Sequence, residues 1–405
     1  MVNSLSLLVH FQDTQEANKT AFHATIAACT TKMKLSKVHN TARRLEHGGY
    51  GPEAKLRGSV RIGNMGKTLN KAAMVVVTYK RQELLTGLFD SILQLTQAPW
   101  RIVVVDNENS ADTRTMVEQF SERVTGRWGR TIIDGSGNQD RVVYLPQDHN
   151  GGGAGGFSAG VRKAYELGAK WFWVMDDDVA VEPEGLDLLA KWTDRYQVIQ
   201  GSRLDYDGGP FYWQYHFLTA LGIPDPIAPG DFGPSGCRPM NTMCFEGGFF
   251  SRQIVEQIGL PDPRFFIYWD DTIYGYLASK VTRPVVVSDV VMRRTRNIAN
   301  WNIAGVRQLN STSDMNRYHI MRNRGFMARY FMVHGDYRPL AFALGTLATA
   351  LKEIIRLLAV DRSHIMTGIS AILKGWVDSR QILHDPKWRP MESLKDQPAG
   401  EARRA

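Results

Sequence analysis

The sequence is poor in cysteine and has no apolar run long enough to cross a membrane. Its three cysteines, Cys29, Cys237 and Cys244, are widely spaced among 405 residues. This pattern excludes a disulfide framework and a CxxC zinc site and fits a reducing compartment. The longest apolar run, residues 339–351, ends at Lys352, well short of the ~20 residues of a spanning helix. The amino-terminal stretch lacks the charged segment of a cleavable signal. We therefore expect a cytoplasmic protein with no transmembrane helix.

Composition places the chain among ordinary folded proteins and excludes the disordered and collagen-like classes. Hydrophobic residues make up 43% and charged residues 22%, which suits a globular protein of two to three units. The net charge of +8 is uneven: residues 1–71 carry +7, residues 72–316 carry −6 and residues 317–405 carry +7. An acidic centre is unsuited to tracking phosphates, whereas basic flanks suit an anionic membrane leaflet. We expect no nucleic-acid partner and an anionic membrane surface as a partner.

Four short β-rich runs alternate with segments of helical periodicity from residue 72 onward. The runs are residues 73–78, 101–106, 141–146 and 171–176. Their continuous apolar character indicates strands that are buried on both faces, so the alternation predicts an α/β fold with an open, mostly parallel sheet. Ligands of such sheets bind beyond the carboxyl ends of the strands.

Three consecutive carboxylates, Asp176, Asp177 and Asp178, end the fourth of these runs. Like charges this close raise one another's pKa unless a cation or hydrogen-bond donors neutralise them. Mg²⁺ and Mn²⁺ take such oxygen ligands, usually one or two carboxylates together with substrate phosphates. Alternate residues of an extended chain share a side. We therefore predict that Asp176 and Asp178 bind a divalent metal, Mn²⁺ or Mg²⁺, and the nucleotide, with Asp177 opposite them. The alternative is an acidic turn that caps the helix after Pro183.

A glycine-rich segment, NGGGAGG at residues 150–156, precedes a predicted helix. Glycines let backbone N–H groups approach a phosphate at a helix N-terminus, so candidate nucleotide contacts are Asn150, Gly152, Gly153 and Gly155. The segment also contains a GxGxxG pattern with an acid 20 residues on, at Asp176. That spacing is typical of dinucleotide-binding proteins. A nucleotide-binding oxidoreductase is therefore an alternative from a different class.

Two further groups of polar residues follow predicted strands. Asp106 ends the second run and Thr78 ends the first, where an Asp side chain can accept hydrogen bonds from a uracil or a ribose; an Asx turn is the alternative. In the segment FFIYWDD at residues 265–271, Asp270 and Asp271 follow Trp269. Carboxylates beside aromatic rings suggest a general base in a pocket that stacks a sugar. Alternatively, Asp270 caps the following helix.

The carboxyl-terminal part reads as helical and basic. Residues 313–382 predict two or three helices, and residues 352–380 keep apolar residues at helical spacing with basic residues between them. This pattern is typical of an interfacial amphipathic segment and also of a pair of core-packing helices. We expect three regions: a basic appendage at 1–71, a catalytic domain at 72–316 and a basic, possibly membrane-associating helical region at 317–405.

The order of these motifs resembles glycosyltransferase family 2 with the GT-A fold. The matching segments are VVTYKR, VVDN, NGGGAGGF, WVMDDD and FIYWDD, followed by YHIMRNRG at 318–325. Within that family the chain is similar to the bacterial UDP-galactofuranosyltransferases of cell-wall galactan and O-antigen synthesis. The resemblance spans about residues 72–335. It implies a metal-dependent, inverting transfer of a sugar from a nucleotide diphosphate to a cell-surface glycan, often linked to a polyprenyl diphosphate at the inner face of the membrane.

The resemblance also implies roles for individual residues. Asp106 would bind the uracil and Thr78 would line the same pocket. Asp176 and Asp178 would hold the metal and the diphosphate, and Asp271 would deprotonate the acceptor hydroxyl. General chemistry agrees, because inversion needs one base opposite a leaving group that is stabilised by a cation and backbone amides.

The sequence departs from the galactofuranosyltransferase pattern at two places. These enzymes complete the metal shell with a histidine some twenty residues past WDD, and residues 285–297 contain none. The residues that stand there instead are Asp289, Met292, Arg293, Arg294 and Arg296. Thr272 and Ile273 also follow WDD where an acid is common. A rhamnosyltransferase that uses dTDP-rhamnose is therefore the alternative within the same family.

Overall fold

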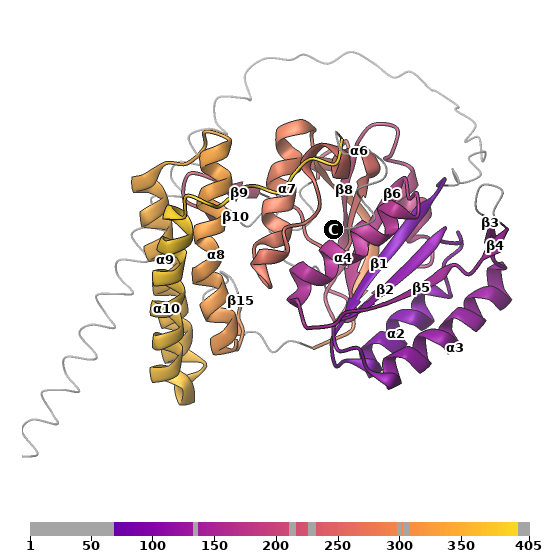
Figure 1. Ribbon diagram of the computed structural model, residues 1–405, viewed down its shortest axis with the longest axis horizontal. Helices are drawn as coiled ribbons and strands as arrows, with labels where there is room; N and C mark the ends of the chain where they lie inside the picture. Colours follow the sequence, from indigo (N-terminus) through magenta and orange to yellow (C-terminus); the bar gives the residue numbers. More distant parts are fainter. Residues whose placement is uncertain are drawn as a thin grey trace, which may run out of the picture. The chain divides into compact units, whose positions relative to one another are not determined.

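The computed structural model describes residues 69–132, 137–209, 216–225, 232–297, 301–302 and 308–395, and a mixed β-sheet organises them (Figure 1). The strands follow the order β11-β13-β8-β12-β6-β1-β2-β5, and β7 pairs with β13. Their bounds are β1 Ala72–Thr78, β2 Arg101–Asp106, β5 Val142–Pro146, β6 Trp171–Asp176, β7 Val179–Val181, β8 Val198–Leu204, β11 Cys237–Pro239, β12 Gly248–Ser251 and β13 Val285–Arg294.

Six of these nine strands run in one direction. β1 is parallel to both β2 and β6, and β2 is parallel to β5. β12 is antiparallel to both β6 and β8, so β8 and its parallel partner β13 share the direction of β6. Only β7, β11 and β12 among the sheet strands run the other way. The predicted mostly parallel α/β sheet is confirmed, and its first four strands match the four predicted runs within one residue.

Helices cover both faces of the sheet because its strands are apolar on both faces. Met74 and Val76 of β1 belong to the apolar cluster that includes α2 and α3, whereas Val75 and Val77 belong to the cluster that includes α4. Gly156 of α4 lies where any Cβ would press into Val77, so glycine allows this helix to pack closely on β1. The helices of this part are α2 Gln82–Ile92, α3 Ala111–Trp128, α4 Gly152–Glu166, α5 Gly185–Ala190, α6 Arg252–Ile258, the 3₁₀ turn η2 Pro263–Phe265 and α7 Asp270–Val281.

Three long helices follow the sheet, in agreement with the predicted helical carboxyl-terminal segment. They are α8 Asp314–Val333, α9 Pro339–Ala359 and α10 Ile365–His384, with the 3₁₀ turn η3 Arg362–His364 before α10. α8 shares an apolar cluster with α7 and η2. No helix in the described part of the chain is both long and apolar enough to span a membrane.

The remaining strands form small pairs outside the main sheet. These pairs are β3 Thr131–Ile132 with β4 Asn138–Gln139, β9 His216–Leu218 with β10 Ile223–Asp225, and β14 Trp301–Asn302 with β15 Gln308–Leu309. The predicted appendage at 1–71 lies outside the described residues except for its last three. The division of the chain at residues 71 and 316 stays a prediction.

Candidate active site

The carboxyl ends of β1 and β6 bring Thr78 and the acidic triplet together. The Thr78 hydroxyl donates to Asp177 Oδ2 at 2.6 Å. Arg81, just beyond β1, donates through Nη1 to Asp177 Oδ1 at 3.0 Å and to Asp178 Oδ2 at 3.3 Å. Burial raises the pKa of Asp177, and Arg81 and Thr78 oppose that rise. Asp177 therefore braces the two strand ends from inside, where it is 2% exposed.

Asp176 and Asp178 are partly exposed, on either side of the buried Asp177. Burial raises the pKa of Asp176 well above its usual range, and the charges of Asp178 and Glu246 add to that rise. The pKa of Asp178 is raised by burial and by Glu246 as well, although Arg81 and Arg294 oppose it. In the described part of the chain the Asp176 carboxylate accepts no hydrogen bond. The two side chains thus form a strained anionic pair that a cation would relieve.

Glu246, just before β12, is a site residue that the sequence did not reveal. It is 6% exposed and forms an ion pair with Arg203 of β8. Arg294 of β13 binds it with both arms of its guanidinium, at 2.9 Å to Oε1 and 3.1 Å to Oε2. Burial alone would raise the pKa of Glu246, but the two arginines outweigh burial and lower it. An ionised carboxylate is therefore fixed beside the acidic triplet.

The oxygen donors of Asp176 and Asp178 fit a divalent cation of the Mg²⁺ or Mn²⁺ type, which takes one or two carboxylates and completes its shell with phosphates and water. Across the described residues, no group of three or more His, Cys, Asp or Glu side chains is arranged around one ion position. A metal held here would thus depend on the substrate for further ligands.

The segment after WDD supplies no third carboxylate or imidazole to this position. Asp289 accepts from the Trp192 indole at 2.7 Å. Met292 is fully buried, and Arg293 pairs with Glu182 at 3.1 Å. Of the five residues considered in place of the missing histidine, Arg294 makes contact with the acidic cluster, and Arg296 acts on Asp178 through its charge.

Asp270 and Asp271 form the first turn of α7, which the left-handed Trp269 precedes as the N-cap residue. Asp270 is therefore not the N-cap that the alternative proposed. Asp271 accepts the Thr272 backbone N–H at 2.6 Å and the Thr272 hydroxyl at 3.2 Å. Burial raises the pKa of Asp271, and these hydrogen bonds together with one from the Cys244 thiol oppose the rise.

Cys244 connects the two acidic motifs. Its thiol hydrogen-bonds Asp271, while its sulfur accepts the Glu246 backbone N–H at 3.2 Å. The Gln200 side chain of β8 holds the Cys244 backbone N–H at 3.0 Å. Glu246 in turn acts electrostatically on Asp176 and Asp178. Charge interactions from the β6 carboxylates to Glu246, and hydrogen bonds from Glu246 through Cys244 to Asp271, thus connect the two acidic motifs.

The loop that presents Asp270 and Asp271 has an unusual backbone. Phe266, Tyr268 and Trp269 have φ of 65°, 68° and 71°, a region that costs non-glycine residues about 1 kcal/mol or more each and that is concentrated at functional sites. Such a loop persists only when its surroundings hold it in place.

α8 provides that support through its motif at 318–325. The Asn323 amide, fully buried, donates to the carbonyl oxygens of Phe265, Ile267 and Tyr268 at 2.9, 2.8 and 2.9 Å. Arg322 Nη2 donates to the Phe265 carbonyl at 2.9 Å as well. The segment that the resemblance identified by its residues therefore acts on the backbone of the 265–271 loop.

The glycine-rich segment supports the same loop. The Ala154 N–H donates to the Phe266 carbonyl at 3.0 Å. Gly152 has a φ of 70°, and a Cβ there would overlap the same carbonyl. The Asn150 side chain accepts the Gly152 N–H at 2.9 Å. A Cβ at Gly155 would meet open space, and one at Gly153 would only touch the Phe157 ring at 4.0 Å. The Gly153 N–H makes no hydrogen bond within the described residues.

Asp106 and Trp269 both have contacts inside the protein. Fully buried Asp106 accepts the backbone N–H groups of Glu108 and Ser110 at 2.9 and 3.0 Å and the Tyr144 hydroxyl at 2.8 Å, which is the Asx-type turn of the alternative. The Trp269 indole donates to the Ile320 carbonyl at 3.2 Å. Their nucleotide contacts stay predictions.

The structure thus assembles the predicted residues around one end of the sheet. Asn107 links the end of β2 to the glycine-rich segment by donating to the Gly152 carbonyl at 3.0 Å. The residues that sequence reasoning missed are Arg81, Cys244, Glu246 and Asn323. Arg81 lies within the VVTYKR motif and Asn323 within YHIMRNRG, so their motifs carried a signal. Glu246 stands alone among apolar residues and glycines, and that isolation was its only signal.

Comparison with known proteins gives consistent matches. Residues 73–258 match the model described as Glycosyl transferase family 2. The galactofuranosyltransferase GlfT1 of Mycolicibacterium smegmatis is 28% identical over 203 residues, 49% of this chain and 61% of that protein. GlfT1 of Mycobacterium tuberculosis H37Rv is 27% identical over 209 residues, 49% of this chain and 60% of that protein. The chain spans less than two thirds of the length of these curated relatives.

Among solved structures, residues 1–349 of S. aureus TarS in complex with UDP-GlcNAc resemble this chain loosely. The two are 14% identical, with a TM-score of 0.46, and the likeness covers 78% of this chain and 82% of that one.

Proposed function

The chain contains a glycosyltransferase family 2 domain at residues 73–258, and from this premise we propose that it is an inverting, metal-dependent hexosyltransferase. The sugar moved is galactofuranose from UDP-galactofuranose, and the acceptor is a cell-surface glycan carried on a polyprenyl diphosphate. The names of the two GlfT1 relatives support the choice of sugar. The family decides against the oxidoreductase alternative, and Gly156 of its GxGxxG pattern packs on β1 instead of facing a ligand.

One observation carries the proposal: two acidic motifs 92 residues apart in the sequence are joined into one site. Asp178 and Asp270 are the nearest residues of the two motifs, and Glu246 and Cys244 connect them. A structural role for either motif alone would not require this connection. Displacement at a sugar carbon does require it, since one group must stabilise the leaving diphosphate while another accepts the proton of the incoming hydroxyl.

Asp271 is the base in this scheme. The acceptor oxygen forms a bond to the anomeric carbon as its proton passes to the Asp271 carboxylate. The bond between that carbon and the diphosphate oxygen breaks, and UDP leaves with the electron pair. Burial, which raises the pKa of Asp271, makes it a stronger base than a free aspartate. Burial and the charge of Asp271 raise the pKa of the neighbouring Asp270 as well, since two carboxylates this close disfavour each other's ionisation.

The opposite side of the site binds the leaving group. Asp176 and Asp178 would hold a divalent cation, which when bound neutralises the diphosphate. Arg81 and Arg294 add positive charge near the same carboxylates. The Gly153 N–H at the start of α4, which has no hydrogen-bond partner within the described residues, would be a further donor.

The nucleoside end of the donor lies toward β1 and β2. Thr78 lines this pocket together with Asp177, and Asp106 keeps its predicted role toward the uracil, although it is fully buried and already accepts three hydrogen bonds. Asn150, Gly152 and Gly155 border the diphosphate, and Trp269 borders the sugar. These placements follow the predicted roles and the nearness of the strand ends.

Turnover of a donor panel tests the proposal. UDP-galactofuranose and dTDP-rhamnose are each offered with a polyprenyl-linked glycan acceptor, with and without Mn²⁺, and release of the nucleoside diphosphate is followed. We expect release from UDP-galactofuranose that chelation abolishes and that Asp271→Asn lowers by about 10²-fold to 10⁴-fold. UDP binding by Asp271→Asn, measured by calorimetry, should stay near that of the unaltered chain.

The outcomes separate the parts of the proposal. Release from dTDP-rhamnose alone would favour the rhamnosyltransferase alternative, which the missing histidine and Thr272 already keep open. If chelation of divalent metal leaves the release of nucleoside diphosphate unchanged, the proposed reaction does not use a metal. A chain that binds none of the nucleotides would overturn the transferase assignment.

The place of action is part of the same proposal. A lipid-linked acceptor requires the enzyme at the inner face of the cell membrane, held peripherally, because no described helix can span it. The basic carboxyl-terminal helices would provide the attachment.

A further inference from the structure

α9 has its apolar side outward and its polar side inward. Every exposed residue of this helix is apolar, and the six large ones form a stripe along its length: Leu340, Leu344, Leu347, Leu351, Ile355 and Leu358. Leu340 is 85% exposed and Leu347 is 66% exposed, whereas Glu353 on the inner side is fully buried. A helix of a water-soluble protein shows the reverse arrangement.

Contacts on the inner side fix this orientation. Arg324 of α8 donates to the hydroxyls of Thr346 and Thr349 at 2.8 and 3.2 Å. Arg356 pairs with buried Glu353 at 2.9 Å. Gly345 lies against the Leu221 carbonyl, where a side chain would overlap it. Turning the helix to bury its leucines would break the contacts with Arg324 and Leu221 and would bring the buried Glu353–Arg356 pair to the surface, so the outward stripe is built into the fold.

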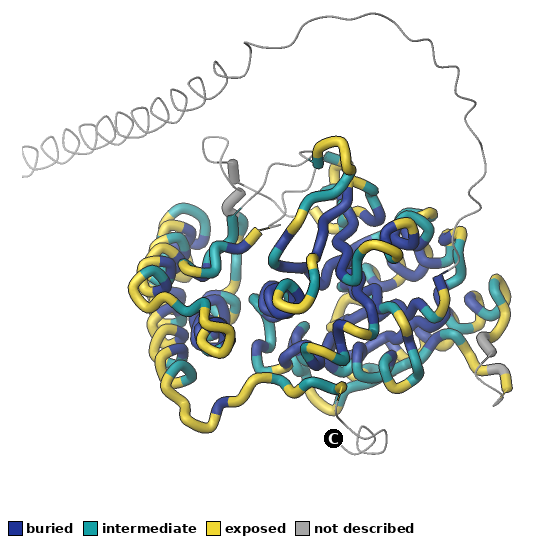
Figure 2. Tube along the Cα trace, turned by 90° about the horizontal axis from the view of Figure 1, so that it is seen from above, coloured by how far each residue is buried: buried dark blue, intermediate teal, exposed yellow. Residues whose placement is uncertain are grey.

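α10 continues the pattern beside α9. Its inner side carries the small residues Gly368, Gly375 and Ser379, which pack closely against neighbouring helices. Its outer side carries Met366 at 80% exposure and Trp376 at 47%. Figure 1 shows α9 and α10 next to each other beside α8, and Figure 2 shows exposed residues along these outer helices. We call this surface the α9–α10 face.

Basic side chains surround the α9–α10 face. Arg362 in the turn between the helices and Lys374 and Arg380 on α10 are all exposed. Most acids of this region are buried or bonded within the protein: Glu353 is buried, Asp361 pairs with buried Arg317 and Asp378 accepts the Tyr318 hydroxyl, whereas Asp385 just after α10 is exposed. A stripe of apolar side chains bordered by positively charged side chains suits a partner whose interior is apolar and whose outer layer is negatively charged.

We propose that the α9–α10 face docks on an anionic phospholipid bilayer, with its leucines among the acyl chains and its basic rim among the headgroups. The rim distinguishes this occupant from a second copy of the chain. Two copies joined through the face would bring Arg362, Lys374 and Arg380 of each toward those of the other, and like charges oppose such a contact. An anionic headgroup layer attracts them.

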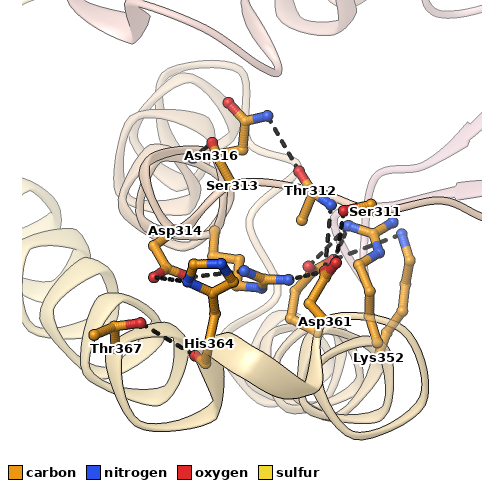
Figure 3. A network of polar contacts seen from close by, with 12 residues as sticks. Ser311, Thr312, Ser313, Asp314, Asn316, Lys352, Asp361, His364 and Thr367 are labelled. Atoms are coloured by element: carbon orange, nitrogen blue, oxygen red, sulfur yellow. Dashed lines mark hydrogen bonds and ion pairs between the residues drawn. The ribbon is translucent and has the colours of Figure 1, made fainter.

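The docked helices are connected to the active-site loop. Asp361, at the turn between α9 and α10, accepts hydrogen bonds from Ser311 and Thr312 and an ion pair from Arg317 at the start of α8 (Figure 3). The Tyr268 hydroxyl of the 265–271 loop hydrogen-bonds Thr312. The face therefore fixes the height of this loop above the bilayer, which suits a lipid-linked acceptor. The docking makes specific the membrane attachment named in the proposed function, and this last point rests on its lipid-linked acceptor.

Flotation of the full chain with lipid vesicles tests the docking without any sugar donor. The vesicles are phosphatidylcholine alone and phosphatidylcholine mixed with phosphatidylglycerol, at low and at high salt. We expect the chain to float with the mixed vesicles at low salt and to bind phosphatidylcholine alone much more weakly. Because sugar transfer is not measured, failure here leaves the proposed reaction untouched, and failure of the donor panel leaves the docking untouched.

Matched variants assign the binding to the face. Leu344→Gln/Leu347→Gln should weaken vesicle binding about tenfold or more, since two apolar side chains are lost from the bilayer. Tyr206→Gln/Val281→Gln removes two exposed apolar side chains elsewhere and should leave binding unchanged.

A third variant tests the rim. Arg362→Gln/Lys374→Gln/Arg380→Gln should weaken binding on the order of a hundredfold at low salt, at about 1 kcal/mol for each charge. Circular dichroism checks that each variant folds.

Three results would overturn the proposal. The first is an unaltered chain that stays unbound with both vesicle types at low salt. The second is a leucine variant that binds as well as its control. The third is a dimer in solution that the leucine variant dissociates, because the face would then be covered by a second copy.

Discussion

The two acidic motifs of the site are held in place by opposite means. Asp176–Asp178 stand at the end of a strand and are stabilised by positive charges, chiefly Arg81, while Arg294 opposes the repulsion between Asp178 and Glu246. Asp270–Asp271 stand on a loop with three residues in left-handed conformation, and neutral hydrogen bonds from Asn323 hold that loop. The first motif is positioned by regular structure and electrostatics. The second is positioned by a helix that begins more than forty residues later in the chain.

The comparison teaches that a motif and its support can lie far apart in sequence. For the β6 motif, disrupting the support means removing a charge. For the α7 motif, it means removing an amide or adding a methyl group. The two kinds of support can therefore be broken separately.

Removing the Glu246 charge should have the largest effect on stability. Glu246→Gln leaves Arg203 and Arg294 buried without their carboxylate, which should lower the free energy of unfolding by about 3–5 kcal/mol. Glu182→Gln is the matched control, because its pair with Arg293 is half exposed and is worth about 0–1 kcal/mol. Urea unfolding of both variants measures the difference. Equal losses would show that the Glu246 cluster is no more than a surface ion pair.

Removing the Asn323 amide should destabilise the 265–271 loop. Asn323→Ala removes the side-chain donor from the Ile267 and Tyr268 carbonyl groups, while the Phe265 carbonyl keeps its bond from Arg322, so we expect a loss of about 2 kcal/mol in unfolding free energy together with a lower kcat. Asn316→Ala, in the first turn of the same helix, removes only a contact with Thr312 and should cost less than about 1 kcal/mol. If Asn323→Ala keeps full kcat while losing stability, the loop does not need this support for its geometry.

Adding a methyl group at two glycines should have effects of opposite sign. Gly152→Ala places a Cβ on the Phe266 carbonyl at a positive φ and should cost about 2 kcal/mol or more. Gly155→Ala meets open space within α4 and should gain up to about 1 kcal/mol from helix propensity. Thermal melts compare the two. A raised KM for the donor in Gly155→Ala alone would place the diphosphate at this helix end.

The smallest expected effect is a displacement of the pH profile. Under the proposed function Asp271 must be ionised to act as the base. The rate constant kcat should therefore be highest above the raised pKa of Asp271 and should fall as pH drops through it, at a pH above the ~3.9 of a free aspartate. The Cys244 thiol opposes that rise, so Cys244→Ala should move the acid limb to higher pH. An acid limb of the pH profile that stays at the same pH or moves to lower pH would contradict either the Cys244–Asp271 hydrogen bond or the proposed role of Asp271 as the base.

Much of the fold could be predicted from local patterns. The four apolar runs became β1, β2, β5 and β6 because a strand buried on both faces must be apolar throughout. Because neighbouring parallel strands end at the same edge of a sheet, the carboxyl ends of β1 and β6 were expected to lie together. The structure accordingly brings Thr78 and the acidic triplet into contact. β8, β12 and β13 were harder, because their place in the sheet depends on pairings between distant segments.

The site was only partly predictable, and for the same physical reason. Glu246 becomes a site residue through Arg203 and Arg294, which come from two other strands. The glycines of the 150–156 segment suggested a phosphate cradle, and the structure uses Gly152 and Gly156 for close packing instead. A glycine in the sequence indicates a close approach without indicating what approaches.

The hydrogen bonds of α8 have a consequence for protein engineering. The residues that match the family model end at 258, yet the loop with Asp271 and the helix that holds it both lie beyond that point. A chimera that exchanges only the matched segment would take Asp176–Asp178 from one protein and leave Asp270–Asp271 with their support in another. The transplantable unit therefore extends at least through α8. Under the proposed function, donor preference and acceptor activation should be inherited from different ends of it.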